Sequence, residues 1–364
     1  MNFDFSDDAK TMRESARKFL DANAGAAIAR KSMNGTATYD ADLWKAVIDL
    51  GWTAARVPEE FGGVGLTAEE SCVLAEEAGR SLAPIPLTSV LAATEALLRA
   101  GSKEQQARWL PGIAEGKVIA CVGWGEGNAA SPSTAALTVK DGKASGVKLP
   151  IADLLGAQLA IITANGPKGV QLYLVDLGGA GVKTELVETL DLVRRSGKLT
   201  LDNAAVEALG DPDAYQDWLD RAAILAAFEA LGTTAASMDM TVAYAKDRVA
   251  FGQRIGRYQG VKHKCADMYI KLELARAHAL HGAWAMGADA GELRQAASAA
   301  RVASLDALSF TAEETVQLHG GIGFTWESDC QFYYRRNRQL ASALGSSAWW
   351  ADRLVRALER RNAA

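Results

Sequence analysis

The sequence contains few of the residues that build metal centres or disulfide frameworks. Its 364 residues include four cysteines and four histidines. The cysteines lie far apart and form no CxxC pair, at Cys72, Cys121, Cys265 and Cys330. This spacing fits neither a zinc knuckle nor a disulfide framework, so we expect reduced, buried thiols. His278 and His281 share one helix face, but no third ligand lies nearby, which argues against a metal site.

Two further absences narrow the class of protein. The net charge is −5, and no basic stripe indicates nucleic-acid binding. No apolar run reaches the roughly 18 to 20 residues of a membrane helix. The opening segment MNFDFSDDAK is acidic, where a signal peptide would be basic and then apolar. We therefore expect a cytoplasmic globular protein that binds neither nucleic acid nor a membrane.

Three blocks with different hydrophobic patterns follow one another along the chain. Residues 4–115 show helical spacing of apolar positions. Residues 118–207 show short apolar runs, such as QLAIITA and VQLYLVDL, separated by turn segments such as NGPKG and LGGAG. Helical patterns then return over residues 217–247, 258–287, 291–318 and 346–361. The pattern predicts a mostly α chain with a β middle domain: an N-terminal helical domain (1–116), the middle β domain (117–208) and a C-terminal four-helix bundle (209–364).

One stretch, RVAFGQRIGRYQGVKHKCADM (248–268), concentrates arginines, glutamines, glycines and an aromatic residue in an otherwise helical region. With three other segments it resembles the acyl-CoA dehydrogenase family over nearly the whole chain. Those segments are GWTAARVPEEFGGVGL (51–66), LDLVRRSGKLTLD (190–202) and QLHGGIGFTWE (317–327). Each motif is weak alone, whereas four in the family's order are specific.

The resemblance implies a fold, a reaction and partners. The family fold has N-terminal helices, a small β-barrel or sandwich domain and a C-terminal four-helix bundle, usually in dimers or tetramers. The family reaction is α,β-dehydrogenation of an acyl-CoA thioester, in which a carboxylate removes the α-proton and FAD accepts the β-hydrogen as hydride. An electron-transfer flavoprotein is the electron acceptor that the resemblance implies. No motif specifies the acyl group.

The resemblance also assigns cofactor contacts, which in the family reach the FAD of a neighbouring subunit. Arg248 matches the arginine that meets the pyrophosphate, a role suited to a planar, permanently charged fork. The implied contacts are Arg248, Phe251, Gln259, Gln317, Gly320 and Gly321. We expect Arg254, Arg257 and the run YYRRNR (333–338) to be surface or interface charge, and His263 and His319 to be packing residues.

The positions of the catalytic base depart from the family. The usual glutamate before the Gly-Thr-Ser motif corresponds to Leu344, and the alternative glutamate, 26 positions before Arg248, corresponds to Ala222. Neither side chain can accept a proton, and loss of a general base typically costs about 10²- to 10⁴-fold in rate. The family's tryptophan and threonine beside the flavin ring correspond to Pro150 and Ala152.

Three hypotheses remain open for function, and no catalytic residue is assigned. The leading one is the non-catalytic subunit of a heteromeric acyl-CoA dehydrogenase, with a homologous partner in an α2β2 complex. The second is an active homomeric enzyme with a displaced base, for which Glu229 is the candidate because it lies two helical turns after Ala222. The third is a non-redox scaffold or binding protein of the same fold.

Overall fold

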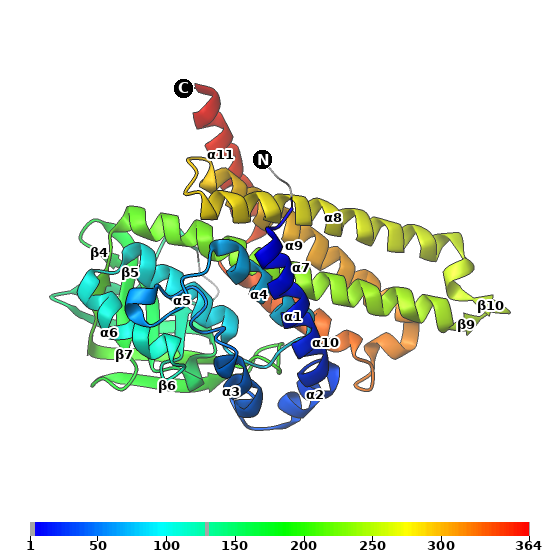
Figure 1. Ribbon diagram of the computed structural model, residues 1–364, viewed down its shortest axis with the longest axis horizontal. Coiled ribbons are helices and arrows are strands. Elements are labelled where there is room, and N and C mark those ends of the chain that lie inside the picture. Colours follow the sequence, from blue (N-terminus) through cyan, green and yellow to red (C-terminus); the bar gives the residue numbers. More distant parts are fainter. Residues whose placement is uncertain (1–3, 128–130, 364) are drawn as a thin grey trace.

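The computed structural model describes residues 4–127 and 131–363 and confirms the predicted fold class. A helical N-terminal part, a mixed sheet and a group of long helices follow one another along the chain (Figure 1). In Figure 1 the sheet lies at one end of the molecule, and the short hairpin of β9 (Val249–Ala250) and β10 (Gln253–Arg254) lies at the other. Within the described residues, no helix is both long enough and apolar enough to cross a membrane.

The N-terminal helices begin at polar caps that the sequence supplies. Ser6 accepts a hydrogen bond from the Ala9 amide and begins the first helix. Ser102 and Gln105 form a reciprocal capping box at the last one. The elements of this part are α1 (Asp7–Asn23), α2 (Ala26–Asn34), α3 (Ala41–Asp49), η1 (Glu59–Phe61), α4 (Ala68–Arg80), α5 (Leu87–Ala100) and α6 (Lys103–Ala114).

The middle part is one eight-stranded mixed sheet with the order β6-β7-β3-β2-β4-β5-β8, in which β1 pairs with β4 in parallel. Strand β4 (Leu159–Gly166) begins with an apolar run, and residues 159–164 are all buried, as expected for a strand covered on both faces. Its elements are β1 (Ala120–Gly123), β2 (Thr138–Lys140), β3 (Lys143–Ala152), η2 (Leu154–Gly156), β4 (Leu159–Gly166), β5 (Gly169–Asp176), β6 (Val182–Val187), β7 (Ser196–Ala205) and β8 (Glu207–Leu209).

The C-terminal part is built on one very long helix, α7 (Pro212–Asp247). Its 36 residues span about 54 Å at 1.5 Å per residue, so it reaches from the sheet to the opposite end of the molecule (Figure 1). The other elements are η3 (Ile255–Arg257), α8 (Gln259–Gly287), α9 (Leu293–His319), η4 (Gly320–Phe324), α10 (Cys330–Ser342) and α11 (Ser347–Ala363).

Helix α10 corrects one expectation. The run 333–338 lies on this helix, and Arg336 is 1% exposed rather than on the surface. Its guanidinium pairs with the carboxylate of Asp191, which is buried as well. The expectation of surface charge for the whole run was wrong at Arg336, because the composition of a run does not show which face of a helix turns inward.

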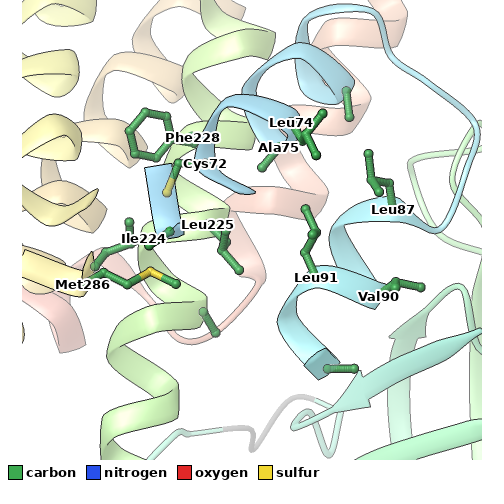
Figure 2. Packing of buried hydrophobic residues seen from close by; sticks show 14 of the residues in the cluster. Cys72, Leu74, Ala75, Leu87, Val90, Leu91, Ile224, Leu225, Phe228 and Met286 are labelled. Atoms are coloured by element: carbon green, nitrogen blue, oxygen red, sulfur yellow. The ribbon is translucent and has the colours of Figure 1, made fainter. Parts of the chain in front are cut away.

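The main core joins the N-terminal helices to α7. Figure 2 shows Leu74 and Ala75 of α4 and Leu91 of α5 on one side, with Ile224, Leu225 and Phe228 of α7 on the other. All these side chains are at most 2% exposed. Burial of this apolar surface therefore holds the first half of α7 against α4 and α5.

Candidate functional site

A cavity of about 220 Å³ lies where the N-terminal helices, the sheet and the first half of α7 meet. The positions predicted for the base and for the flavin ring all line this one cavity: Pro150, Ala152, Ala222 and Leu344. They come from β3, from α7 and from the loop after α10, which are distant in sequence. The structure thus brings together the two positions expected for a base and the two expected beside a flavin ring.

The loop that carries Leu344 is held firmly although it contains no proton acceptor. Leu344 adopts a positive φ of 56°, a conformation that a leucine rarely takes. The indole Nε1 of Trp350 donates to the Leu344 carbonyl at 2.8 Å. The buried Arg301 donates to the Leu340 and Ala343 carbonyls at 2.5 and 2.6 Å. The backbone at Leu344, one of the positions predicted for a base, is therefore fixed, while its side chain is aliphatic.

The one carboxylate that lines the cavity, among the described residues, is Glu229. Arg194 Nη1 lies 3.0 and 3.2 Å from its two carboxylate oxygens. Arg336 approaches one of them at 3.4 Å. Because Glu229 is 4% exposed, both ion pairs are inside the protein. To take a substrate proton, this carboxylate would have to weaken two buried ion pairs.

Arg194 was not predicted as a site residue, although it lies in the quoted segment 190–202. It donates from Nε to Asp153 at 2.8 Å and from Nη2 to the Ser89 hydroxyl at 2.8 Å, in addition to its pair with Glu229. Burial disfavours its charged form, but Asp153 and Glu229 outweigh this effect and raise the pKa of Arg194. One guanidinium thus joins α5, the sheet and α7 beside the cavity.

A second ion pair that sequence analysis missed supports the cavity wall on the sheet side. Lys148, which is fully buried, donates to Glu126 at 2.6 Å and to the Thr163 hydroxyl at 3.0 Å. Burial lowers the pKa of Lys148, and Glu126 acts in the opposite direction. The pair links β3, just before Pro150, to the loop at Glu126. The sequence signal for it was a lysine, Lys148, within the mostly apolar run GVKLPI (146–151).

The first group of predicted cofactor contacts lies at the other end of α7. Arg248 follows the last residue of this helix, and Phe251 and Gln259 lie on the following hairpin and at the start of α8. All three side chains are exposed, and the ring of Phe251 is 95% exposed. Within the described residues, the Arg248 guanidinium makes no ion pair. Its charge is therefore available to a group outside this chain.

The second group of predicted contacts lies beside the first. Gln317 lies in the last turn of α9, which ends at His319, and Gly320 and Gly321 begin η4. The ring of Tyr244, one turn before Arg248, stacks on the His319 ring with 4.3 Å between ring centroids. Gly320 has a φ of +66°, and a Cβ at Gly320 or Gly321 would meet no atom within 4 Å. The two groups thus form one open, exposed surface.

Within one chain, this exposed surface and the cavity are too far apart to form one site. A rigid helix separates Ala222 from Arg248 by 26 positions, which corresponds to about 39 Å. Figure 1 shows the hairpin at the end of the bundle opposite the sheet.

No group of three or more potential metal ligands occurs in residues 4–127 and 131–363, so the His278 and His281 pair has no third ligand there.

Comparison with known proteins agrees with this architecture. The family description "Acyl-CoA dehydrogenase, N-terminal domain" matches residues 6–117, and "Acyl-CoA dehydrogenase, C-terminal domain" matches residues 213–359. Acyl-CoA dehydrogenase IpdE2 of Mycolicibacterium smegmatis is 33% identical over 341 residues, which cover 93% of this chain and 95% of that protein.

Two solved structures are similar over almost their whole length. A variant of the Tcur3481-Tcur3483 steroid ACAD has a TM-score of 0.91 at 30% identity and covers 98% of this chain and 99% of its own. The ChsE4-ChsE5 complex from Mycobacterium tuberculosis has a TM-score of 0.90 at 25% identity, with 99% of each chain covered.

The helical, sheet and bundle parts define an oxidoreductase fold with a cavity at the junction of its three parts. The chain belongs to the acyl-CoA dehydrogenase family.

Proposed function

We propose that this chain is the non-catalytic subunit of a heteromeric acyl-CoA dehydrogenase and completes the FAD site of its partner. The observation that carries the proposal is a contrast between two surfaces. The cavity presents Leu344 and Ala222 where a base is needed. The opposite end of the molecule presents Arg248 with its charge unpaired within the described residues. Selection for an in-chain active site would preserve the first surface as well as the second.

The residues of the exposed surface fit a bound dinucleotide. Arg248 would meet the pyrophosphate with a charged fork, and Gln259 and Gln317 would supply neutral hydrogen bonds. The open backbone at Gly320 and Gly321 allows close approach of a ligand. FAD, when bound there, supplies the hydride acceptor of the family reaction. The partner subunit would supply the carboxylate that removes the α-proton.

The chain's own cavity is a poor fit for the same cofactor and substrate. Its volume of about 220 Å³ lies below the roughly 300 to 1,000 Å³ typical of small-molecule sites. Pro150 and Ala152 offer neither a hydroxyl nor an indole to a flavin ring. Glu229 is engaged by Arg194 and Arg336. This chain is therefore not expected to hold its own FAD.

Exposed apolar side chains support a partner along the C-terminal helices. Large hydrophobic residues project from the hairpin, from α8 and from the η4 region: Val249, Phe251, Tyr269, Ile270, Leu274, Ile322, Phe324 and Trp326. Clusters of this kind mark protein interfaces. The occupant we propose is a homologous acyl-CoA dehydrogenase subunit in an α2β2 complex, as the relation to the ChsE4-ChsE5 complex supports. Its substrate would be an acyl-CoA thioester, steroid-derived as in the related steroid ACAD, with an electron-transfer flavoprotein as acceptor.

The test is the flavin content of the chain alone and of the chain co-purified with a homologous partner. We expect little flavin alone and about one FAD per pair of unlike chains, because only the mixed interface holds a complete site. About one FAD per chain in the lone protein, together with turnover, would refute the proposal. A complex that is colourless in every preparation would favour the scaffold hypothesis.

Arg248→Ala tests the proposed phosphate contact directly. We expect the FAD dissociation constant of the complex to rise about ten- to hundredfold, since a charge-assisted hydrogen bond contributes roughly 1.5 to 3 kcal/mol and 1.4 kcal/mol corresponds to a factor of ten. Arg254→Ala is the matched control, because Arg254 is exposed on the same hairpin. Equal effects of the two substitutions would show a non-specific charge effect instead of a pyrophosphate contact.

One observation favours the homomeric alternative: Glu229 lies on the cavity wall. If Glu229 were a displaced base, the lone chain would turn over an acyl-CoA thioester. Glu229→Gln would then abolish that activity. Unchanged turnover in this variant would remove Glu229 from consideration.

A further inference from the structure

A buried polar seam joins α7 to α9 next to the exposed cofactor surface. Ser237, Thr241 and Tyr244 follow one another at helical spacing on α7. They face Thr315 and His319, which lie on α9. The Thr315 hydroxyl lies 2.9 Å from both the Ser237 and Thr241 hydroxyls. Polar groups that satisfy each other in an apolar interface fix one register between two helices, because a shift along the axis would leave them unpaired.

The end of this seam is a stack of two rings. The Tyr244 and His319 rings lie 4.3 Å apart between centroids and 22° from parallel. The Tyr244 hydroxyl donates to the His319 carbonyl at 3.3 Å. The Nδ1 atom of His319 lies 2.7 Å from the Thr315 carbonyl. Because a carbonyl only accepts, Nδ1 carries the hydrogen, and this bond fixes the orientation of the ring.

The backbone of each ring-bearing residue is linked to one group of the predicted cofactor contacts. The backbone amide of Arg248 donates to the Tyr244 carbonyl at 2.8 Å. On the other side, His319 is the residue immediately before Gly320 and Gly321. The stack is thus a short mechanical link between two segments separated by about seventy residues of chain. Both segments are otherwise exposed.

We propose that the Tyr244–His319 stack sets the spacing between Arg248 and the Gly320–Gly321 turn, and so sets the affinity of the composite FAD site. The proposal rests on the proposed function, because the FAD concerned is the one bound at the interface with the partner. Tyr244 and His319 are positioning residues in this scheme. They hold the backbone that carries the contacts and do not touch the cofactor themselves. A ligand that bridges both segments loses affinity when their spacing is no longer preorganised.

The experiment measures the dissociation constant of FAD with the complex of this chain and its homologous partner, after the bound flavin has been removed. Tyr244→Leu removes the stacked ring, and we expect the FAD dissociation constant to rise about three- to tenfold. Tyr244→Phe keeps the ring and loses the hydroxyl, so it should remain within about twofold of the wild type. His319→Leu removes the same stack from α9 and should match Tyr244→Leu, which covers the case that one variant does not fold.

Tyr215→Leu is the matched control. Tyr215 also lies on α7, stacks on Trp218 with 6.1 Å between centroids and donates to the Pro132 carbonyl at 2.7 Å. It is buried near the sheet end of the helix, so its loss destabilises the protein without changing the cofactor surface. We expect it to leave the FAD dissociation constant unchanged, and size-exclusion chromatography to show an intact complex for every variant.

Three results would overturn the inference: wild-type affinity in Tyr244→Leu, an equal loss in Tyr215→Leu, or an equal loss in Tyr244→Phe. Arg248→Ala separates this failure from a failure of the proposed function. If Arg248→Ala weakens FAD binding and Tyr244→Leu does not, only the positioning role is wrong. If the wild-type complex binds no FAD, or Arg248→Ala has no effect, the proposed function is wrong and the inference falls with it.

Discussion

Glu229 illustrates how a single residue can have the right chemistry and the wrong surroundings. It lies on the cavity wall, two helical turns after Ala222, where the resemblance implies a base. Its oxygens are nevertheless engaged by Arg194 and Arg336, which are themselves buried. A carboxylate held in this way contributes to stability as an anion, whereas a general base must be free to exchange protons. We therefore treat Glu229 as a structural anion.

Glu229→Gln should accordingly affect stability and leave catalysis alone. The substitution keeps the shape of the side chain and removes its charge, so two buried arginines lose a counter-ion. We expect the free energy of unfolding to fall by about 3 to 5 kcal/mol in urea denaturation. The turnover of the complex should be unchanged.

Glu313→Gln is the control for this change. Glu313 pairs with Arg338 on the surface, and its side chain is 59% exposed, so the cost should stay below about 1 kcal/mol. Loss of turnover in Glu229→Gln without loss of stability would contradict the structural role.

His319 should make stability depend on pH. Burial lowers the pKa of His319 below its usual value of 6.5, and its hydrogen bond with Thr315 opposes this in part. As the pH falls below 6.5, the unfolded chain binds a proton on this ring before the folded protein does. Protons therefore favour unfolding in the window between 6.5 and the lower pKa of the folded state. The stability contribution is complete above pH 6.5 and declines on acidification.

The measurement is urea denaturation of the wild type and of His319→Gln between pH 5 and 8, a range around the histidine pKa. The wild type should lose more stability than the variant as the pH falls below 6.5. His278→Gln, at an exposed ring, should retain the wild-type dependence. Parallel curves for the wild type and His319→Gln would contradict the prediction.

At the scale of elements, two glycines allow α4 and α7 to pack with their backbones in direct contact. A Cβ added at Gly232 of α7 would overlap the Glu76 carbonyl of α4, and one added at Gly79 of α4 would overlap the Glu229 carbonyl of α7. The Thr233 hydroxyl donates to the Gly79 carbonyl at 3.2 Å across the same contact. This close crossing places α7, and with it Glu229, against the N-terminal helices.

Gly232→Ala should therefore destabilise the protein although alanine is the better helix former. We expect a loss of about 1 to 3 kcal/mol or more, the usual cost of overpacking. Gly260→Ala in α8 is the control, since its Cβ would meet no atom within 4 Å. That change should be neutral or stabilise by up to about 1 kcal/mol. Equal melting temperatures for the two variants would show that the helices can separate at little cost.

At the scale of the whole molecule, Arg194 holds the three parts together at one point. It meets Ser89 of α5, Asp153 after β3 and Glu229 of α7. Arg336 of α10 extends the network to Asp191. The parts thus share buried charges as well as an apolar core, and removal of one partner leaves the others uncompensated.

Arg194→Met should cost about 3 to 5 kcal/mol of unfolding free energy, because Asp153 and Glu229 lose their shared cation. The double variant Arg194→Met with Glu229→Leu should lose less than the sum of the two single losses, since the second change removes a stranded charge. Arg195→Met is the control: Arg195 donates to the Gly35 carbonyl and meets no carboxylate within the described residues. Additive losses in the double variant would contradict a shared network.

The sequence by itself determined the order of the three parts, helical, β and helical, because hydrophobic period and turn residues are local properties. It also predicted aliphatic residues, Leu344 and Ala222, at the positions where the resemblance implies a base, and an aliphatic side chain has no group that can accept a proton in any environment. It did not predict helix α10 (Cys330–Ser342). The burial of Arg336 could not be predicted, because α10 reads as a basic surface run until its inward face is known.

Only the tertiary structure decided what these residues do together. It placed Glu229 between Arg194, more than 30 positions away in the sequence, and Arg336, more than 100 positions away. It also placed Tyr244 on His319, beside the two segments of predicted cofactor contacts. The physical reason is the same in each case. Charge pairing and ring stacking act over a few ångströms, and only the packing of long helices brings such distant positions within that range.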